Sequence, residues 1–246
     1  MNITRPWKRI MAVGCSHGPF IDPLAKEAVV KFRKKWIRSG KGDRVVHLGD
    51  FTDMSAFMSS AKADGGGDPI KPDITAGLAF LDELKITDAL GGNHEARLWR
   101  EMSSKNEIVS YAATHLVETI LTRVKRMGAT FSPYNGVFQK LRIGNYDWMH
   151  GTMYGENATR DHAEAFGNVV HAHTHRAGVA KGRRSDNPTG FSVGTLTKAG
   201  AMEYASTRRA TLSWSQGFVW GEYCDDLCVL WLHEQPSTST EWRLPV

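Results

Sequence analysis

The chain has 246 residues, of which 41% are hydrophobic and 23% are charged, as in ordinary globular proteins. Its 31 lysines and arginines exceed its 26 aspartates and glutamates, and the formal net charge of +5 favours an anionic partner. No apolar run approaches the roughly 20 residues that a membrane helix needs, the N-terminus lacks the apolar core of a signal peptide, and three cysteines argue against a disulfide framework, so we expect a cytoplasmic protein with no membrane partner.

Helices and strands alternate in the first half of the chain. Short apolar runs predict buried strands, and longer segments with apolar residues at helical spacing predict helices. The predicted elements are, in chain order, a strand over 9–14, a helix over 23–38, a strand over 44–48, a helix over 73–84 with Asp73 as its N-cap, a strand over 87–90 and a helix over 107–127.

Short strands predominate in the second half. The predicted strands are 137–143, 146–150, 169–172, 191–196, 217–223 and 227–233. Alternating elements followed by a run of strands are typical of two packed sheets with helices outside. We therefore predict an α/β fold, a two-sheet β-sandwich flanked by helices, in a single domain over 1–246.

Polar residues gather where the predicted strands end. Seven of the ten histidines lie in five such short stretches or, for His47, just before one. The stretches are Cys15-Ser16-His17-Gly18, Gly49-Asp50-Phe51-Thr52-Asp53, Gly91-Gly92-Asn93-His94-Glu95, His150-Gly151 and His171-Ala172-His173-Thr174-His175. Strand ends of an open sheet converge on one crevice, and imidazole, carboxylate, carboxamide and thiolate groups are all metal ligands. This placement indicates a metal centre.

The ordered set of stretches resembles the calcineurin-like metallophosphoesterase superfamily over about residues 10–180. The superfamily pattern is D-x-H, G-D-x-x-D, G-N-H-E/D, H and G-H-x-H. The matching residues are Cys15-Ser16-His17, Gly49-Asp50-Phe51-Thr52-Asp53, Gly92-Asn93-His94-Glu95, His150 and Ala172-His173-Thr174-His175. The resemblance implies a hydrolase that cleaves a phosphate ester with water activated between two divalent metal ions.

The resemblance also implies a role for each matching residue. It assigns the first metal to Cys15, His17, Asp50 and His175, and the second to Asp50, Asn93, His150 and His173. Asp50 would bridge the two ions, which would be manganese, iron or zinc. His94 would stabilise the reacting phosphate or protonate the leaving oxygen, and Asp53 would orient His94.

Two positions depart from the superfamily pattern. Cys15 stands where an aspartate is usual, as in RNA lariat debranching enzymes, and its soft thiolate favours zinc or iron at the first site. Ala172 replaces a glycine of the last motif, so the ligand pair is either His171 with His173 or His173 with His175. We favour His173 and His175, because Thr174 and Arg176 then fit the pattern better.

Met54, Arg97 and the net charge bear on the substrate class. Met54 occupies the place of an arginine that protein phosphatases of this superfamily carry, and Arg97 is a candidate to grip a phosphate oxygen instead. Together with the positive net charge, this favours a phosphodiesterase or nuclease that acts on a nucleic acid or nucleotide. The alternatives are a phosphomonoesterase that acts on protein or a metabolite, and an inactive metal-binding scaffold.

Overall fold

Strand β1 (Lys8–Val13) contributes side chains to two hydrophobic layers. Ile10 and Ala12 pack on one side of the strand, whereas Met11 and Val13 pack on the other. This alternation is that of a strand covered on both faces. The computed structural model describes residues 6–38, 41–58, 69–202, 205, 209–236 and 241–245.

The first sheet is mixed and has β1 near its centre. Its order is β11 (Cys228–Glu234), β10 (Gly217–Tyr223), β1, β2 (Arg44–His47), β3 (Asp88–Leu90) and β4 (Thr130–Ser132). Strands β1 to β4 are parallel, with Ile10 opposite Arg44, and β10 runs antiparallel to β1. The carboxyl ends of β1, β2 and β3 therefore meet at one edge.

The second sheet lies against the first and has a parallel centre. Its order is β5 (Leu141–Ile143), β6 (Tyr146–Met149), β7 (Val169–His171), β9 (Thr189–Val193) and β8 (Ala177–Lys181). Strands β6, β7 and β9 are parallel, and β5 and β8 are the antiparallel edges. Trp148 and Val170 of this sheet pack in the same core as Ile10 and Ala12.

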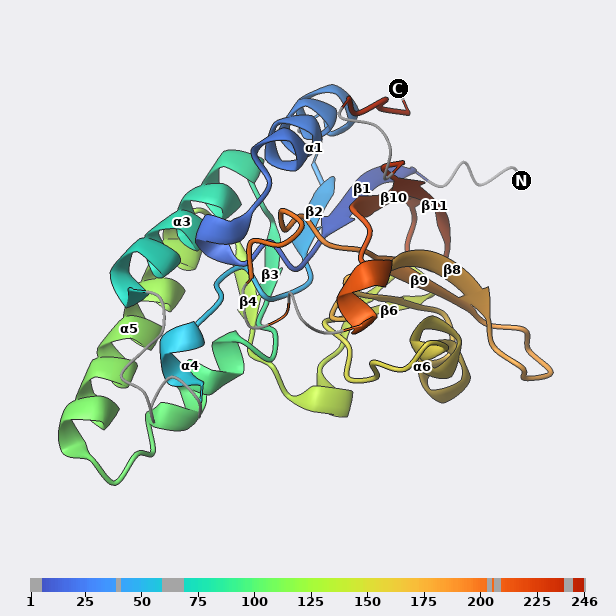
Figure 1. Cartoon of the computed structure of the whole chain (residues 1–246). Coiled ribbons are helices and arrows are strands. Elements are labelled where there is room, and N and C mark those ends of the chain that lie inside the picture. Colours follow the sequence, from blue (N-terminus) through green and yellow to red (C-terminus); the bar gives the residue numbers. More distant parts are fainter. Residues whose placement is uncertain are drawn as a thin grey trace.

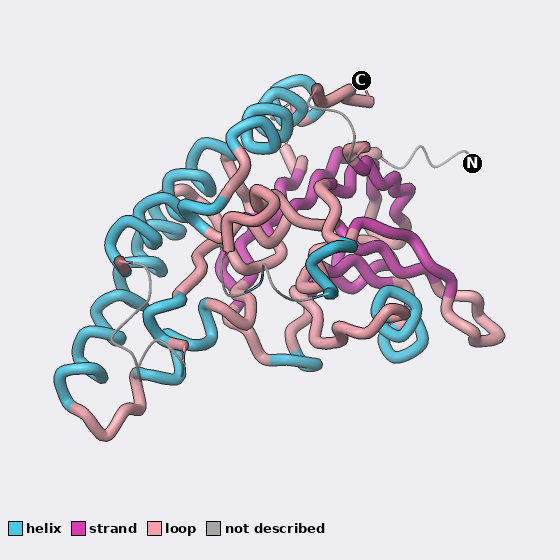
Figure 2. The backbone as a smooth tube through the Cα atoms, viewed as in Figure 1, coloured by secondary structure: helices cyan, strands magenta, loops and turns pink. Residues whose placement is uncertain are grey.

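Helices cover the outer face of each sheet (Figure 1). The helices are α1 (Pro23–Trp36), α3 (Ile70–Leu84), α4 (Glu95–Glu101), α5 (Glu107–Arg126) and α6 (Ala158–Phe166). Helices α1, α3 and α5 pack with Met11 and Val13, while α6 packs against β7, β8 and β9 on the second sheet. Figure 2 shows the strands as the middle layers between these helices. In the described part of the chain, none of the helices has the length and apolarity to cross a membrane.

The predicted fold class, two sheets flanked by helices, is confirmed. The predicted N-cap at Asp73 is wrong, because α3 begins at Ile70 and the Asp73 carboxylate instead accepts hydrogen bonds from the backbone of Asp53 and Met54. The predicted strand over 137–143 is partly wrong, because a 3-10 helix at Gly136–Phe138 precedes β5. Among the α-helices and strands of the described residues, α4, β4, α6 and β8 were not predicted.

Candidate metal centre

The side chains predicted as ligands lie together at the carboxyl ends of strands from both sheets. Turns after β1 and β2 carry Cys15, His17 and Asp50, and the turn after β3 carries Asn93. The second sheet brings the remaining three, His150 after β6 and His173 and His175 after β7. The site therefore exists only when the two sheets pack, because neither sheet alone carries the whole set.

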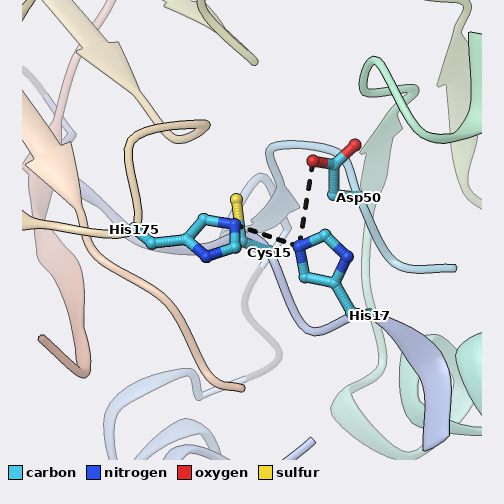
Figure 3. Close-up of side chains that lie close together, drawn as sticks. All are labelled: Cys15, His17, Asp50 and His175. Atoms are coloured by element: carbon cyan, nitrogen blue, oxygen red, sulfur yellow. Dashed lines mark hydrogen bonds and ion pairs between the residues drawn. The ribbon is translucent and has the colours of Figure 1, made fainter. Parts of the chain in front are cut away.

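The first group consists of Cys15, His17, Asp50 and His175. One potential ligand atom from each lies within 4.8 Å of the others, and all four residues are buried. Their ends point toward one another, as Figure 3 shows. The His17 Nε2 atom is 3.0 Å from His175 Nε2 and 3.9 Å from Asp50 Oδ2.

The second group shares Asp50 with the first and adds His150 and His173. His150 Nε2 is 3.3 Å from Asp50 Oδ2. Asn93 Oδ1 lies 2.9 Å from His150 Nε2 and 2.9 Å from His173 Nδ1, so the carboxamide joins this group. Asp50 is thus placed between two sets of donors, the position that a bridging ligand occupies.

The backbone of the site is held in an uncommon conformation. Five of the seven predicted ligands have positive φ angles, between 50° and 69°: Cys15, His17, Asp50, His173 and His175. Non-glycine residues rarely adopt this left-handed region, and such strain clusters at functional sites. Gly92 allows the turns to approach, because a Cβ there would overlap Asp50 Oδ1. These strained turns direct the side chains of the predicted ligands toward one another.

The buried lone pairs of the two groups suit cations. His150 Nδ1 is 2.8 Å from the Leu48 carbonyl oxygen and donates to it, so in the neutral ring Nε2 keeps its lone pair facing the Asp50 carboxylate. His17 repeats this pattern, with Nδ1 3.1 Å from Asp53 Oδ1 and Nε2 facing His175. Facing acceptors need a proton or a metal ion between them. The residues present therefore fit two divalent ions.

Burial and neighbouring groups shift the pKa values of two predicted ligands in the first group. Burial, followed by the charge of Asp50, raises the pKa of the Cys15 thiol well above its ordinary value. Burial and the neighbouring His17 lower the pKa of His175 well below its ordinary value. A metal ion bound to Cys15 would instead lower the pKa of its thiol, since a coordinating thiol is deprotonated. The thiolate and two imidazoles are borderline-soft donors that suit zinc or iron.

His94 lies at the edge of the two groups, in contact with Asp53. Its Nδ1 is 2.6 Å from the Asp53 carbonyl oxygen and 3.2 Å from Asp53 Oδ1. Burial alone would lower the pKa of His94, but the charge of Asp50 and the hydrogen bond to Asp53 raise it above the ordinary value. The Asp53 carboxylate also contacts His17, so it serves two imidazoles, and the carbonyl makes the shorter contact with His94.

Two other predicted residues are placed by the structure. Arg97 donates from Nη1 to the Asp53 carbonyl oxygen at 3.0 Å, and its Nη2 lies 3.2 Å from His94 Nε2. His171 lies apart from both groups, because its ring stacks on His162 with centroids 4.0 Å apart and its Nε2 faces Thr159. Of the two ligand pairs left open by the sequence, the structure brings His173 and His175 to the groups.

Glu95, Asp73 and Gln139 support the site and had no predicted part in it. The Glu95 carboxylate accepts hydrogen bonds from the backbone N–H groups of Asp50, Thr52 and Gly92. Asp73 accepts from the backbone of Asp53, and Gln139 Oε1 accepts from His150 N at 3.0 Å. Glu95 belongs to the G-N-H-E motif, which was the one available signal, whereas nothing in the sequence marked Asp73 or Gln139.

A cavity of about 460 Å³ opens over the two groups. Asp50, Asn93, His173 and His175 line it, and Trp214 packs edge-on against His175 with ring centroids 4.2 Å apart. The lining also includes His94, Arg97, Tyr154 and Arg176. Anionic and basic groups thus face the same space, as expected of a site that holds cations and an anion together.

No family profile matches this chain, and no curated protein matches it. One similar solved structure is described as a novel archaeal phosphodiesterase, with 12% identity and a TM-score of 0.46, covering 92% of this chain and 99% of that one. Another is a dimetal phosphatase from Danio rerio, with 10% identity and a TM-score of 0.42, covering 91% and 95%. Likenesses this distant do not show a family or an activity.

Proposed function

We propose that this chain is a metal-dependent phosphoesterase with the fold of the calcineurin-like metallophosphoesterases, and that it hydrolyses phosphodiesters. One observation carries the proposal: Asp50 lies between two groups of potential metal ligands, and His94 lies beside them on the same cavity. Cys15, His17, Asp50 and His175 would hold one ion, and Asp50, Asn93, His150 and His173 the other. Two such ions activate water and offset the charge of a phosphate.

His94 is the proposed proton donor to the leaving oxygen. Its Nδ1 proton is committed to the Asp53 carbonyl, so Nε2 is the atom that can give a proton to a bound substrate. The raised pKa of His94 favours the protonated ring that a general acid needs. A protonated Nε2 can no longer accept from Arg97, so the Arg97 Nη2 becomes available to a phosphate oxygen.

The proposed substrate is a phosphodiester, in a nucleic acid or a nucleotide. Met54 is 1% exposed and puts no cation into the cavity, so the grip on a terminal phosphate seen in protein phosphatases has no counterpart at that position. Arg97 and Arg176 line the cavity and can contact the oxygens of a bound phosphate.

Hydrolysis of bis(4-nitrophenyl) phosphate and of 4-nitrophenyl phosphate tests the proposal. The purified chain is assayed with added manganese, zinc or iron, beside His94→Ala. We expect faster hydrolysis of the diester, and a kcat about 100-fold lower or more in His94→Ala with its metal content unchanged. Hydrolysis of the monoester alone would identify a phosphomonoesterase. No hydrolysis with any metal, by protein with a native circular dichroism spectrum, would leave the scaffold alternative.

A further inference from the structure

A second cavity, of about 390 Å³, adjoins the metal centre between α6 and β8. Arg176 lines both this cavity and the one over the metal ligands, so the two are joined at that side chain. The segment that leads into α6 also spans both, with Tyr154 on the first cavity and Glu156 on the second. We call the second cavity the α6–β8 pocket.

The α6–β8 pocket has an excess of positive charge. Arg160, Arg176 and Lys181 line it, against the single carboxylate of Glu156. The Nη2 of Arg176 donates to the carbonyl oxygens of Tyr154 and Gly155, and within the described part of the chain no residue bonds its Nε or Nη1. The Nε of Arg160 is buried and, among the described residues, has no hydrogen-bond partner. The Nε and Nη1 of Arg176 are therefore available to an anionic ligand, and the side chains of Arg160 and Lys181 add positive charge to the lining.

A third cavity beside the metal centre has a different character. A cavity of about 560 Å³ shares Trp214 and Thr211 with the one over the metal ligands. No lysine or arginine is among its described lining residues, and it carries the carboxylate of Asp22. Judged from the described residues, an anionic chain bound at the metal centre is therefore attracted more strongly toward Arg176 than past Trp214.

An exposed aromatic ring stands at the junction with the α6–β8 pocket. Tyr154 is 81% exposed, although tyrosine rings are usually packed at least in part. Its backbone carbonyl oxygen accepts from Arg176, which fixes the residue beside the cationic groups. Aromatic faces next to a basic groove bind unpaired nucleobases by stacking while the cations follow the phosphates.

We propose that the α6–β8 pocket binds phosphates that flank the scissile one, and that the substrate is accordingly a single-stranded nucleic acid. This inference rests on the proposed phosphodiesterase function. The strand would place one phosphate at the metal ligands, a base on Tyr154, and the following phosphates at Arg176, Arg160 and Lys181. Duplexes are disfavoured, because their paired bases cannot stack on Tyr154.

Fluorescence anisotropy of labelled oligonucleotides tests the inference without requiring turnover. The metal-loaded chain is titrated with a twelve-nucleotide oligothymidylate whose phosphorothioate links keep the charge and resist cleavage, and with the matching oligouridylate. Lys181→Ala and Arg160→Ala are compared with Lys125→Ala, a matched change on the exposed face of α5. The binding constant is measured over a range of salt concentrations.

Each phosphate contact with a single strand contributes about 0.7 to the slope of log K against log salt. We expect Lys181→Ala and Arg160→Ala each to lower the slope by about that amount and to weaken binding about fivefold at about 0.1 M salt. Lys125→Ala should change neither quantity. Tighter binding of the DNA or of the RNA strand would then identify which nucleic acid is preferred.

Three results would overturn the inference. Binding of the twelve-nucleotide strand no tighter than that of a dinucleotide would show that the flanking contacts do not form. Equal losses of binding affinity in Lys181→Ala, Arg160→Ala and Lys125→Ala would show the same. Tighter binding of a duplex of the same length would remove the single-strand preference. Any of these results together with hydrolysis of bis(4-nitrophenyl) phosphate would leave the phosphodiesterase function in place, so the two failures are distinguishable.

Discussion

The Glu95 carboxylate lies under the turn that presents Asp50, and Glu95→Gln tests how that turn is held. One oxygen accepts from Asp50 N at 2.9 Å and Gly92 N at 2.7 Å. The other accepts from Thr52 N at 2.8 Å and Thr52 Oγ1 at 2.7 Å. A glutamine side chain has the same shape but a single oxygen. With its NH2 group toward Thr52, the Thr52 hydroxyl can accept from it, but the Thr52 backbone N–H would lack an acceptor.

The expected loss of stability follows from that unpaired backbone N–H. Glu95 is 1% exposed, so water cannot replace the missing acceptor. A buried donor without a partner costs about 1 to 3 kcal/mol, which is the loss expected for Glu95→Gln. A domain is stable by about 5 to 15 kcal/mol in all, so the substitution should remove a measurable part of the total. Burial and Asp50 raise the pKa of Glu95, and the expected loss requires that the carboxylate is nevertheless ionised.

Urea unfolding followed by circular dichroism at neutral pH measures this loss. Glu118→Gln, an exposed change on α5, serves as the control and should shift the free energy of unfolding by less than about 0.5 kcal/mol. A shift below about 1 kcal/mol in Glu95→Gln would show that Glu95 is protonated in the native chain or that its hydrogen bonds do not form, and would refute the reasoning.

Three further predictions concern the metal ligands, the turn glycine and acid stability. Cys15→Ser should weaken zinc binding more than manganese binding, because it removes the soft thiolate, and competition titrations with the two metals check this; an unchanged ratio of affinities would contradict it. Gly92→Ala should destabilise the chain by about 1 to 3 kcal/mol and lower its metal content, since the Cβ would overlap Asp50. Gly155→Ala, where a Cβ meets nothing within 4 Å, is the matched control, and equal effects of the two changes in thermal unfolding would count against the geometry. Burial lowers the pKa of His162, and the neutral ring accepts a backbone N–H at 3.1 Å, so the stability it contributes is present above about pH 6.5 and is lost as pH falls toward the lowered folded pKa. His162→Gln should therefore reduce the loss of stability between pH 7.5 and 5 in urea titrations, and identical losses in the two proteins would show that His162 does not titrate in this way.

The predicted strands and helices that form the layers were found because their patterns are strong. The apolar runs of β1 and β2 are buried on both faces, and α5 has the long helical periodicity of a helix that covers a sheet. The missed elements lack such signals. Helix α6 has the sequence ATRDHAEAF with three buried residues, and the exposed edge strand β8 has the sequence AGVAK. Whether these two segments form a helix and a strand is decided by their packing against each other.

The residues of the site divide in a similar way: local sequence patterns reveal the predicted ligands, whereas only the tertiary structure reveals the residues that support them. The predicted ligands follow strands directly, so strand ends placed them near one crevice before any contact was known. The supporting residues act across the sequence: Glu95 reaches back 45 residues to Asp50, and Asp73 reaches back 20 residues to Asp53. Such partners are set by how helices α3 and α4 dock, and no spacing within the sequence encodes that docking.

Metal content measured by elemental analysis tests the central claim most directly, because the whole site depends on Asp50 lying between two ligand groups. The wild-type chain, saturated with zinc, iron or manganese and freed of excess metal, should hold about two ions per chain. Asp50→Asn should lose both, whereas Asp225→Asn, a change at a fully exposed side chain, should lose neither. A wild-type chain that binds no metal, or an Asp50→Asn variant that keeps both ions, would contradict the account.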